Sequence, residues 1–288
     1  MGERKQRKSL NFSFKSTFLE TIISRNILRT TSQGIERLND KVISEEPLEI
    51  FLQDKSGRSH FITTMRTPGM DFELSAGILY TNGVINSYKE ILSIKYLMSS
   101  RQKSQISIYL NSIPKVNVKE QLSNSACGFC NSGSLEDFVV NSNHPIFSNE
   151  FAILGQLIFN AMKYLNNDSD HFYLTGGNHK VCVINSIGEC VVSAEDVGRH
   201  NAFDKIIGLG LKDKLLPFSG CIVLVSSRCS FELVHKAWMA GIPIIASLGA
   251  PTSKAIELAE DTGISLIGFV KSTSYNIYTH PYRINHDG

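Results

Sequence analysis

The stretch that decides the fold is residues 220–270, GCIVLVSSRCSFELVHKAWMAGIPIIASLGAPTSKAIELAEDTGISLIGFV. Short apolar runs rich in β-branched residues alternate here with longer segments whose apolar residues repeat at helical spacing. The order is strand, helix, strand, helix, strand, which implies parallel strands joined by right-handed crossovers. The sequence therefore predicts an α/β fold in this part of the chain.

The segments before this unit predict further elements that lead into it. Residues 180–196, KVCVINSIGECVVSAED, form two apolar runs that turn at Ile187 and Gly188, which predicts a hairpin. Residues 149–165 have the helical period, and another helix is expected from about residue 201 to 211. A hairpin followed by parallel strands predicts a mixed sheet flanked by helices.

The first half of the chain has a different pattern, in which strands surround one clear helix. Residues 71–85, DFELSAGILYTNGVI, predict this helix, and Gly83 marks its end. The polar stretch QLSNSACGFCNSGS then predicts a loop. We therefore expect a flexible tail at 1–18, a smaller α+β domain at 19–120, a mobile loop at 121–135 and an α/β domain at 136–288.

Length and composition indicate an ordered globular protein. The chain has 288 residues, of which 42% are hydrophobic and 19% are charged, with a net charge of +2. Because the charge is nearly balanced, we expect neither nucleic acid nor an anionic membrane as a partner. No apolar run approaches the roughly 20 residues of a membrane span.

The six cysteines indicate a reducing compartment. The first residues lack the apolar core of a secretory signal, so we expect a cytoplasmic protein with reduced thiols. Four of the cysteines lie in or beside predicted strands, where we expect small buried side chains: Cys182, Cys190, Cys221 and Cys229.

Two helix starts in the α/β half are suited to an anion. Ligands of open α/β sheets bind beyond the carboxyl ends of parallel strands, where helix N-termini offer N–H groups. Arg228 and Ser230 follow one strand, and Thr252 follows the next. Ordinary helix capping explains either site alone, whereas the two together with an arginine favour a nucleotide or pyrophosphate. Neither the GxGxxG nor the P-loop pattern is present.

A third polar cluster, AEDVGRHNAFDK at residues 194–205, lies at another helix start. Arg199 and Lys205 could bind phosphate, and His200 could transfer protons near neutral pH. Caps and a solvated helix face are the alternative interpretation. Arg66, in the turn sequence MRTPGMD, is read as one more arginine that faces an anion.

Cys127 and Cys130, in ACGFC, form a CxxC pair within the polar loop. A structural zinc site needs four ligands, but no second CxxC exists. The H-x-E and P-C-x-x-C patterns of a zinc deaminase are absent as well. Thiol–disulfide exchange usually places the pair at a helix start. An exposed thiolate could instead carry sulfur as a persulfide. A pair without a chemical role remains an alternative.

The chain resembles the FdhD family of formate dehydrogenase accessory sulfurtransferases in seven segments that follow one another in the same order. These segments run from about residue 45 to 284: MRTPGMDFELSAGIL, CGFC, TGGNH, EDVGRHNAFDKIIG, SSRCSFELVHKAWMAGIPIIAS, GAPTSKAIELAEDTGISLIGF and YNIYTHPYRI. The resemblance implies a cytidine-deaminase-like fold without zinc, a homodimer and a cytoplasmic location. It also implies that the α/β domain binds a cofactor.

The resemblance also implies a reaction. Such proteins take sulfur from a cysteine desulfurase and pass it to the molybdenum or tungsten bis-pterin guanine dinucleotide cofactor of formate dehydrogenase. GDP is expected to mimic one end of that cofactor. The persulfide is carried by the first cysteine of the pair, Cys127, with Cys130 in support. The cofactor-binding segment corresponds to Phe269, Val270, Lys271, Ser272, Thr273 and Ser274.

Two positions depart from the family pattern. Asn131 replaces a glycine after the CxxC pair, although asparagine tolerates left-handed backbone angles. Ser227 replaces the glycine of an SGR sequence, so its side chain is expected to narrow the approach to a ligand.

The sequence thus predicts a sulfurtransferase that works as a persulfide carrier. Arg199, His200 and Arg228 are secondary candidates for orienting phosphate or transferring protons. Two alternatives remain: a chaperone that binds the molybdenum cofactor without a covalent relay, and a dithiol redox protein.

Overall fold

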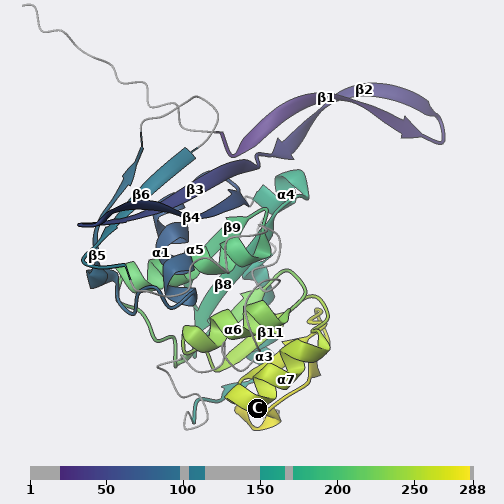
Figure 1. Cartoon of the computed structure of the whole chain (residues 1–288). Helices are drawn as coiled ribbons and strands as arrows, with labels where there is room; N and C mark the ends of the chain where they lie inside the picture. Colours follow the sequence, from purple (N-terminus) through teal and green to yellow (C-terminus); the bar gives the residue numbers. More distant parts are fainter. Residues whose placement is uncertain (1–19, 98–103, 114–149, 166–170, 286–288) are drawn as a thin grey trace, which may run out of the picture.

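The computed structural model describes residues 20–97, 104–113, 150–165 and 171–285 (Figure 1). The predicted tail and the predicted CxxC loop lie outside the described residues, as do Cys127, Cys130 and Asn131. The rest forms a mixed α/β structure, in which two larger sheets are packed together with helices.

A six-stranded mixed sheet forms the centre of the C-terminal half, in the order β13-β12-β11-β10-β8-β9. The middle strands β10, β11 and β12 are parallel, as the strand–helix alternation predicts, and β8 and β9 form the predicted hairpin. Gly188 has a φ of 84° at the turn of this hairpin. The strands are β8 (His179–Asn185), β9 (Cys190–Asp196), β10 (Cys221–Val225), β11 (Ile244–Ser247), β12 (Ser265–Gly268) and β13 (Asn276–Ile277).

Helices cover both faces of this sheet. Apolar residues of α5 (Arg199–Lys212), α6 (Phe231–Met239) and α7 (Ser253–Thr262) pack on the face that carries Val183, Val223 and Ile245. The opposite face carries Cys182 and Leu224, and α3 (Gln156–Ala161) packs there with the short strands β7 (Ile153–Leu154) and β14 (Ile284–Asn285).

The continuous helix predicted over residues 149–165 is wrong at its beginning. Residues 153–154 pair with β14 instead, and Gly155 donates its N–H to the carbonyl of Asn285. The helical period is real only from Gln156, and it continues as a 3₁₀ turn, η2 (Met162–Tyr164). Backbone pairing with a strand far along the chain therefore overrides the local pattern.

The N-terminal half contributes a four-stranded sheet in the order β4-β3-β6-β5 and one long helix. That helix, α1 (Asp71–Thr81), matches the prediction, and Gly83 follows it with a φ of 67°. The other elements are β3 (Glu46–Asp54), β4 (Gly57–Arg66), η1 (Tyr88–Glu90), β5 (Ile91–Tyr96) and β6 (Ser104–Leu110).

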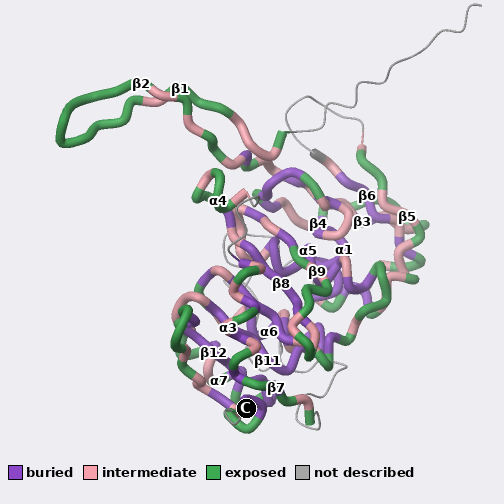
Figure 2. Tube along the Cα trace, turned by 180° about the vertical axis from the view of Figure 1, so that it is seen from behind, coloured by how far each residue is buried: buried purple, intermediate pink, exposed green. Residues whose placement is uncertain are grey.

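A hairpin of two long strands, β1 (Ile22–Thr31) and β2 (Gly34–Ile43), extends away from the body of the molecule (Figure 1). Most of its residues are exposed (Figure 2). The short helix α4 (His171–Thr175) lies against the base of this hairpin, and the 3₁₀ turn η3 (Pro281–Arg283) lies near the C-terminus.

Helices α1 and α5 join the two halves through a contact of backbone on backbone. A Cβ atom added to Gly77 would lie 1.9 Å from the carbonyl oxygen of Asp204, and one added to Gly208 would lie 1.8 Å from that of Glu73. Only glycine permits this approach. One apolar core accordingly contains residues of both halves, such as Leu74 of α1 and Phe203 of α5. The division of the chain at 121–135 stays a prediction.

A buried polar group reinforces this helix crossing. Asp204 of α5 accepts hydrogen bonds from Lys236 of α6 at 2.6 Å and from Thr81 of α1 at 3.0 Å. Three helices therefore share one carboxylate. Because its partners also satisfy its charge, the group fixes the position of the helices at a modest desolvation cost.

We predict that Gly77→Ala destabilises the protein by about 2 kcal/mol. Alanine favours a helix by about 1 kcal/mol over glycine, whereas forcing a methyl group into this contact costs about 3 kcal/mol. Denaturant unfolding of the purified variant measures the difference. Gly220→Ala is the matched control, since a Cβ there meets no atom within 4 Å, and its effect should stay within about 0.5 kcal/mol. Equal stability of the two variants would refute the role of the crossing.

Candidate functional site

The carboxyl ends of four strands meet at one edge of the six-stranded sheet. Strands β10, β11 and β12 are parallel, and β9 points the same way because β8 is antiparallel to both β9 and β10. Helices α5, α6 and α7 begin after three of these strands, and a turn joins β12 to β13 at the same edge. The structure therefore places these residues along one edge: Arg199, His200, Arg228, Ser230, Thr252 and the segment 269–274.

Backbone hydrogen bonds join the loops of this edge into one layer. The loop after β10 bonds to the loop after β11, because Cys229 N–H donates to Ala250 at 3.2 Å and Thr252 N–H donates to Cys229 at 3.0 Å. The turn after β12 bonds to the same loop, since Phe269 N–H donates to Gly249 at 3.1 Å. A ligand at this edge would therefore meet a single, internally bonded surface.

Gly249 permits the close approach of two of these loops. A Cβ atom at this position would lie 2.8 Å from Cα of Arg228. Arg228 itself is exposed, so its guanidinium is available to a ligand. The departure at Ser227 does not narrow the surface as expected, because that residue is buried and its hydroxyl donates to the carbonyl of Arg228 at 3.0 Å.

The segment 269–274 is the exposed turn between β12 and β13. Phe269 has a left-handed φ of 53° and is 41% exposed, whereas Val270 is buried and anchors the turn. Lys271 N–H closes the turn by donating to the carbonyl of Ser274 at 2.8 Å. Lys271, Ser272, Thr273 and Ser274 are all exposed at the tip. The turn thus offers a cation, hydroxyl groups and an aromatic ring to the solvent.

Thr252 forms the ordinary cap of a helix. Its hydroxyl accepts from the N–H of Ala255 at 3.3 Å at the start of α7. Ser230 and Gly198, in contrast, precede α6 and α5 without a side-chain cap. An anion therefore finds the N-termini of α5 and α6 less occupied than that of α7.

His200 forms an ion pair with a residue of the neighbouring helix. Its Nε2 lies 2.7 Å from Oε2 of Glu232, which is in the first turn of α6, and 3.5 Å from the hydroxyl of Ser230. The hydrogen bond from His200 lowers the pKa of Glu232, although partial burial opposes the shift. The pair holds the starts of α5 and α6 together and fixes the ring of His200 at the edge.

Arg199 carries a buried nitrogen atom that has no partner among the described residues. This atom is Nε, and the buried polar groups of folded proteins are nearly always hydrogen-bonded. His179, at the start of β8, has a lowered pKa because it is partly buried and because Arg199 and His200 lie near it. The corner between β8 and α5 therefore holds two cationic or titratable residues, Arg199 and His200, and one buried donor, Nε of Arg199, that has no partner among the described residues.

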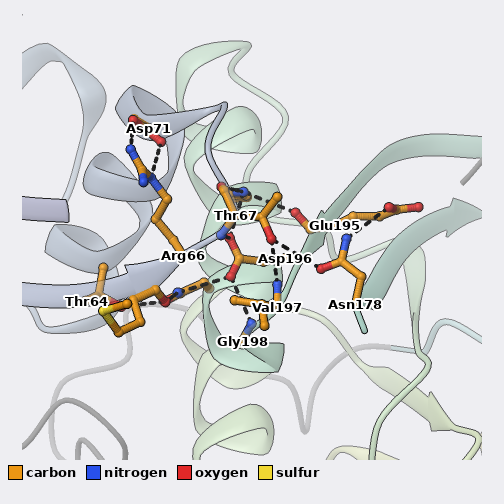
Figure 3. Close-up of polar contacts among 12 residues, drawn as sticks. Thr64, Arg66, Thr67, Asp71, Asn178, Glu195, Asp196, Val197 and Gly198 are labelled. Carbon is orange, nitrogen blue, oxygen red and sulfur yellow. Dashed lines mark hydrogen bonds and ion pairs between the residues drawn. The ribbon is translucent and has the colours of Figure 1, made fainter. Parts of the chain in front are cut away.

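A buried ion pair between α5 and the end of β9 lies beside this corner. Lys205 of α5 lies 2.7 Å from the carboxylate of Asp196 at the end of β9. Asp196 also accepts from the N–H groups of Thr67 at 3.2 Å and Gly198 at 2.9 Å (Figure 3). Burial raises the pKa of Asp196, and Lys205 opposes the rise. These contacts tie the beginning of α5 to the turn between β4 and α1.

Two residues that the sequence suggested for anion binding have structural roles instead. Lys205 is 2% exposed and is fully engaged by Asp196 and by the carbonyls of Thr67 and Glu195. Arg66 is completely buried and bonds bidentately to Asp71 at 2.9 and 2.8 Å (Figure 3). Neither side chain faces a ligand, because each already neutralises a buried carboxylate.

The sequence does not identify Glu232 or His179 as site residues. Glu232 lies two residues after Ser230 and fits the common preference for acidic residues in the first turn of a helix. The pairing of β8 with β9 and β10 places His179 beside the helix starts, and no local pattern signals this pairing. Contacts between elements that are distant in the sequence bring both residues to this edge, so the sequence alone does not identify them.

The four described cysteines differ from one another. Cys182 and Cys229 are buried as predicted, and Cys221 is half-buried. Cys190 is exposed, which contradicts the expectation of a buried side chain. The reason is that β9 forms the edge of the six-stranded sheet.

The described residues contain neither a metal-ligand group nor a helix that could span a membrane. Within 20–97, 104–113, 150–165 and 171–285, no three His, Cys, Asp or Glu side chains are grouped to hold a metal ion. None of the helices in these ranges combines the length and the apolar character of a membrane span.

Comparisons with known proteins agree across most of the chain. The sequence model of the FdhD/NarQ family matches residues 43–285. A protein named Sulfur carrier protein FdhD from Sulfolobus acidocaldarius is 41% identical over 85% of this chain and 92% of its own length. Proteins of the same name from Saccharolobus solfataricus and Nocardia farcinica are 38% and 32% identical, each over 90% of this chain and over 96% and 94% of their own lengths.

A solved structure has the same fold. It is the crystal structure of a candidate formate dehydrogenase accessory protein from Desulfotalea psychrophila, and it aligns with a TM-score of 0.72. The alignment covers 92% of this chain and all of that one, at 24% identity.

The Glu232–His200 pair predicts a pH-dependent contribution to stability. Because folding lowers the pKa of Glu232, its stabilising effect is complete above the ordinary value of 4.5 and is lost as the pH falls through the lowered value. Glu232→Gln should therefore cost about 1.5 kcal/mol near neutral pH, as for a hydrogen bond to a charged group, and progressively less as the pH falls below 4.5.

Denaturant unfolding at a series of pH values tests this dependence. Glu257→Gln is the control, since Glu257 forms an exposed ion pair with Lys254 and should contribute less than about 0.5 kcal/mol at any pH. A cost of Glu232→Gln that does not fall once the pH drops below 4.5 would contradict the assignment.

Proposed function

The chain belongs to the FdhD/NarQ family, and from this we propose that it is a sulfurtransferase serving formate dehydrogenase. It accepts sulfur from a cysteine desulfurase as a cysteine persulfide. It then delivers that sulfur to the molybdenum or tungsten bis-pterin guanine dinucleotide cofactor, which is its substrate. The observation that carries the proposal is the match of residues 43–285 to the FdhD/NarQ family, whose relatives of this chain are named Sulfur carrier protein FdhD.

The first step is an attack by Cys127. Its thiolate attacks the outer sulfur of the desulfurase persulfide, a new S–S bond forms on Cys127, and the desulfurase cysteine leaves as a thiolate. Cys130, two residues further on, protects or resolves the persulfide. Both residues lie outside the described residues, so this step rests on the family pattern CxxC and on general thiol chemistry.

The guanine nucleotide ends of the substrate are proposed to bind at the carboxyl edge of the six-stranded sheet. The exposed guanidinium of Arg228 matches phosphate geometry, and Ser230 opens a helix that has no side-chain cap. The turn at 269–274 adds Lys271 and the ring of Phe269, which is suited to stacking on a base. Thr252 borders this surface as the cap of α7.

Arg199 and His200 are proposed to bind the phosphates at the other end of the edge. The buried Nε of Arg199 has no partner among the described residues, so an anion there would supply one. Glu232 holds the ring of His200 in place at 2.7 Å, and the ring could move a proton near neutral pH. Because His200 and Ser230 are in contact range, the α5 and α6 sites can act on one ligand.

Further features come from the family resemblance and are proposals as well. We propose a homodimer in the cytoplasm whose partners are a cysteine desulfurase and formate dehydrogenase. The likeness of the six-stranded sheet to the cytidine-deaminase fold is part of the same proposal. A chaperone without a covalent relay is the alternative that the cysteine experiment below distinguishes.

We predict that the persulfide forms on Cys127. The full-length protein is incubated with a cysteine desulfurase and cysteine, and the persulfide is located by mass spectrometry after alkylation. Cys127→Ala should abolish the loading and the activation of formate dehydrogenase, whereas Cys221→Ser, at a half-buried cysteine, should leave both intact. Persulfide found on Cys130 and never on Cys127 would contradict the assignment. Full activation by the protein with both cysteines replaced would favour the chaperone.

We also predict that Arg199→Ala weakens the binding of GDP about tenfold, because one charge-assisted contact to phosphate is worth about 1.4 kcal/mol or more. Thermal shift and calorimetry measure the affinity, and saturating GDP at about 100 times its Kd should stabilise the protein by about 2.7 kcal/mol. Arg58→Ala, at the far end of β4, is the control of equal charge. The same affinity in both variants would place the phosphate elsewhere.

A further inference from the structure

Cys182 and Cys190 lie with their thiols in contact on the β8–β9 hairpin. The two Sγ atoms are 3.1 Å apart. Cys190 pairs with Ile184, so Cys182 is its diagonal neighbour on the same face of the sheet, next to a register shift between Val183 and Ile184. The disulfide bond length is about 2.05 Å, so closure requires the sulfur atoms to move together by about 1 Å.

The two thiols have unequal environments. Cys190 is exposed, and its pKa is lowered to about 7, chiefly because the Cys182 thiol donates a hydrogen bond to it. Ser193 and Lys180 lower it further, while partial burial opposes the shift. Cys182 is completely buried. The exposed sulfur can therefore meet a reagent as a thiolate, and the buried one is shielded from reagents in solution.

We propose that Cys190 and Cys182 form a second reactive thiol pair, which undergoes thiol–disulfide exchange with low-molecular-weight disulfides. The Cys190 thiolate attacks one sulfur of a disulfide RSSR, forms a mixed disulfide and releases RS⁻. The sulfur of Cys182 then attacks Cys190 and gives up its proton, and the second RS⁻ leaves and takes that proton. The two cysteines are oxidised to one disulfide, and RSSR is reduced to two thiols.

This pair is separate from the proposed sulfur relay. β8 begins with His179 at the functional edge and runs away from it, so Cys190 lies toward the opposite end of the hairpin, close to the turn at Gly188. The inference therefore does not depend on Cys127 or Cys130. It also means that disulfide reduction by this protein is no evidence for chemistry at the CxxC pair.

Oxidation of the full chain by glutathione disulfide tests the proposal. Cys127→Ser and Cys130→Ser are present throughout, so that only the four described cysteines remain. Trypsin leaves both sulfurs on the peptide 181–199, and cleavage after Glu189 separates Cys182 from Cys190 unless a disulfide joins them. We expect the two fragments to remain linked, and dithiothreitol to separate them.

Single replacements separate the two steps. In Cys182→Ala the resolving sulfur is gone, so glutathione should accumulate on Cys190 as a mixed disulfide. In Cys190→Ser, which changes an exposed residue, Cys182 should stay reduced. Cys221, whose pKa is raised by partial burial, is the internal control and should react about tenfold more slowly than Cys190. The proposal is overturned if Cys190 reacts no faster than Cys221, or if glutathione stays on Cys190 while Cys182 is present.

Discussion

The crossing of α1 and α5 is the constraint on which the rest of the structure depends. Gly77 and Gly208 bring the two helix backbones into direct contact, and no larger residue fits at either position. This contact joins the four-stranded sheet of the first half to the six-stranded sheet of the second. It also presses the turn between β4 and α1 against the end of β9, where Thr67 donates to Asp196. This contact fixes the position of the first turn of α5, and with it the carboxyl edge of the six-stranded sheet.

Buried charges hold this arrangement in register. Asp196 with Lys205, Asp204 with Lys236 and Arg66 with Asp71 are each largely removed from water. Such pairs add little net stability, but removing one partner is costly because the other is left uncompensated. They therefore specify where the elements sit. At the carboxyl edge, by contrast, Arg228 and Lys271 are exposed.

The sequence predicts the local elements well and the long-range contacts poorly. The alternation in residues 220–270, the hairpin that turns at Gly188 and the helix before Gly83 follow from periodicity and turn residues, which are local properties. The burial of Lys205 could not be predicted, because its partners Asp196 and Thr67 come from other elements. The pattern of the first turn of α6 gives no sign that Glu232 bonds to a histidine of another helix.

We propose that the carboxyl edge of the six-stranded sheet binds a guanine nucleotide, and the function proposed for the chain depends on this binding. Hydrogen–deuterium exchange of the full chain with and without saturating GDP tests this claim most directly. We predict slower exchange at the starts of α5 and α6, in the loop after β11 and in the turn at 269–274, with the β1–β2 hairpin unchanged. Protection confined to other segments, or none at saturating GDP, would contradict it.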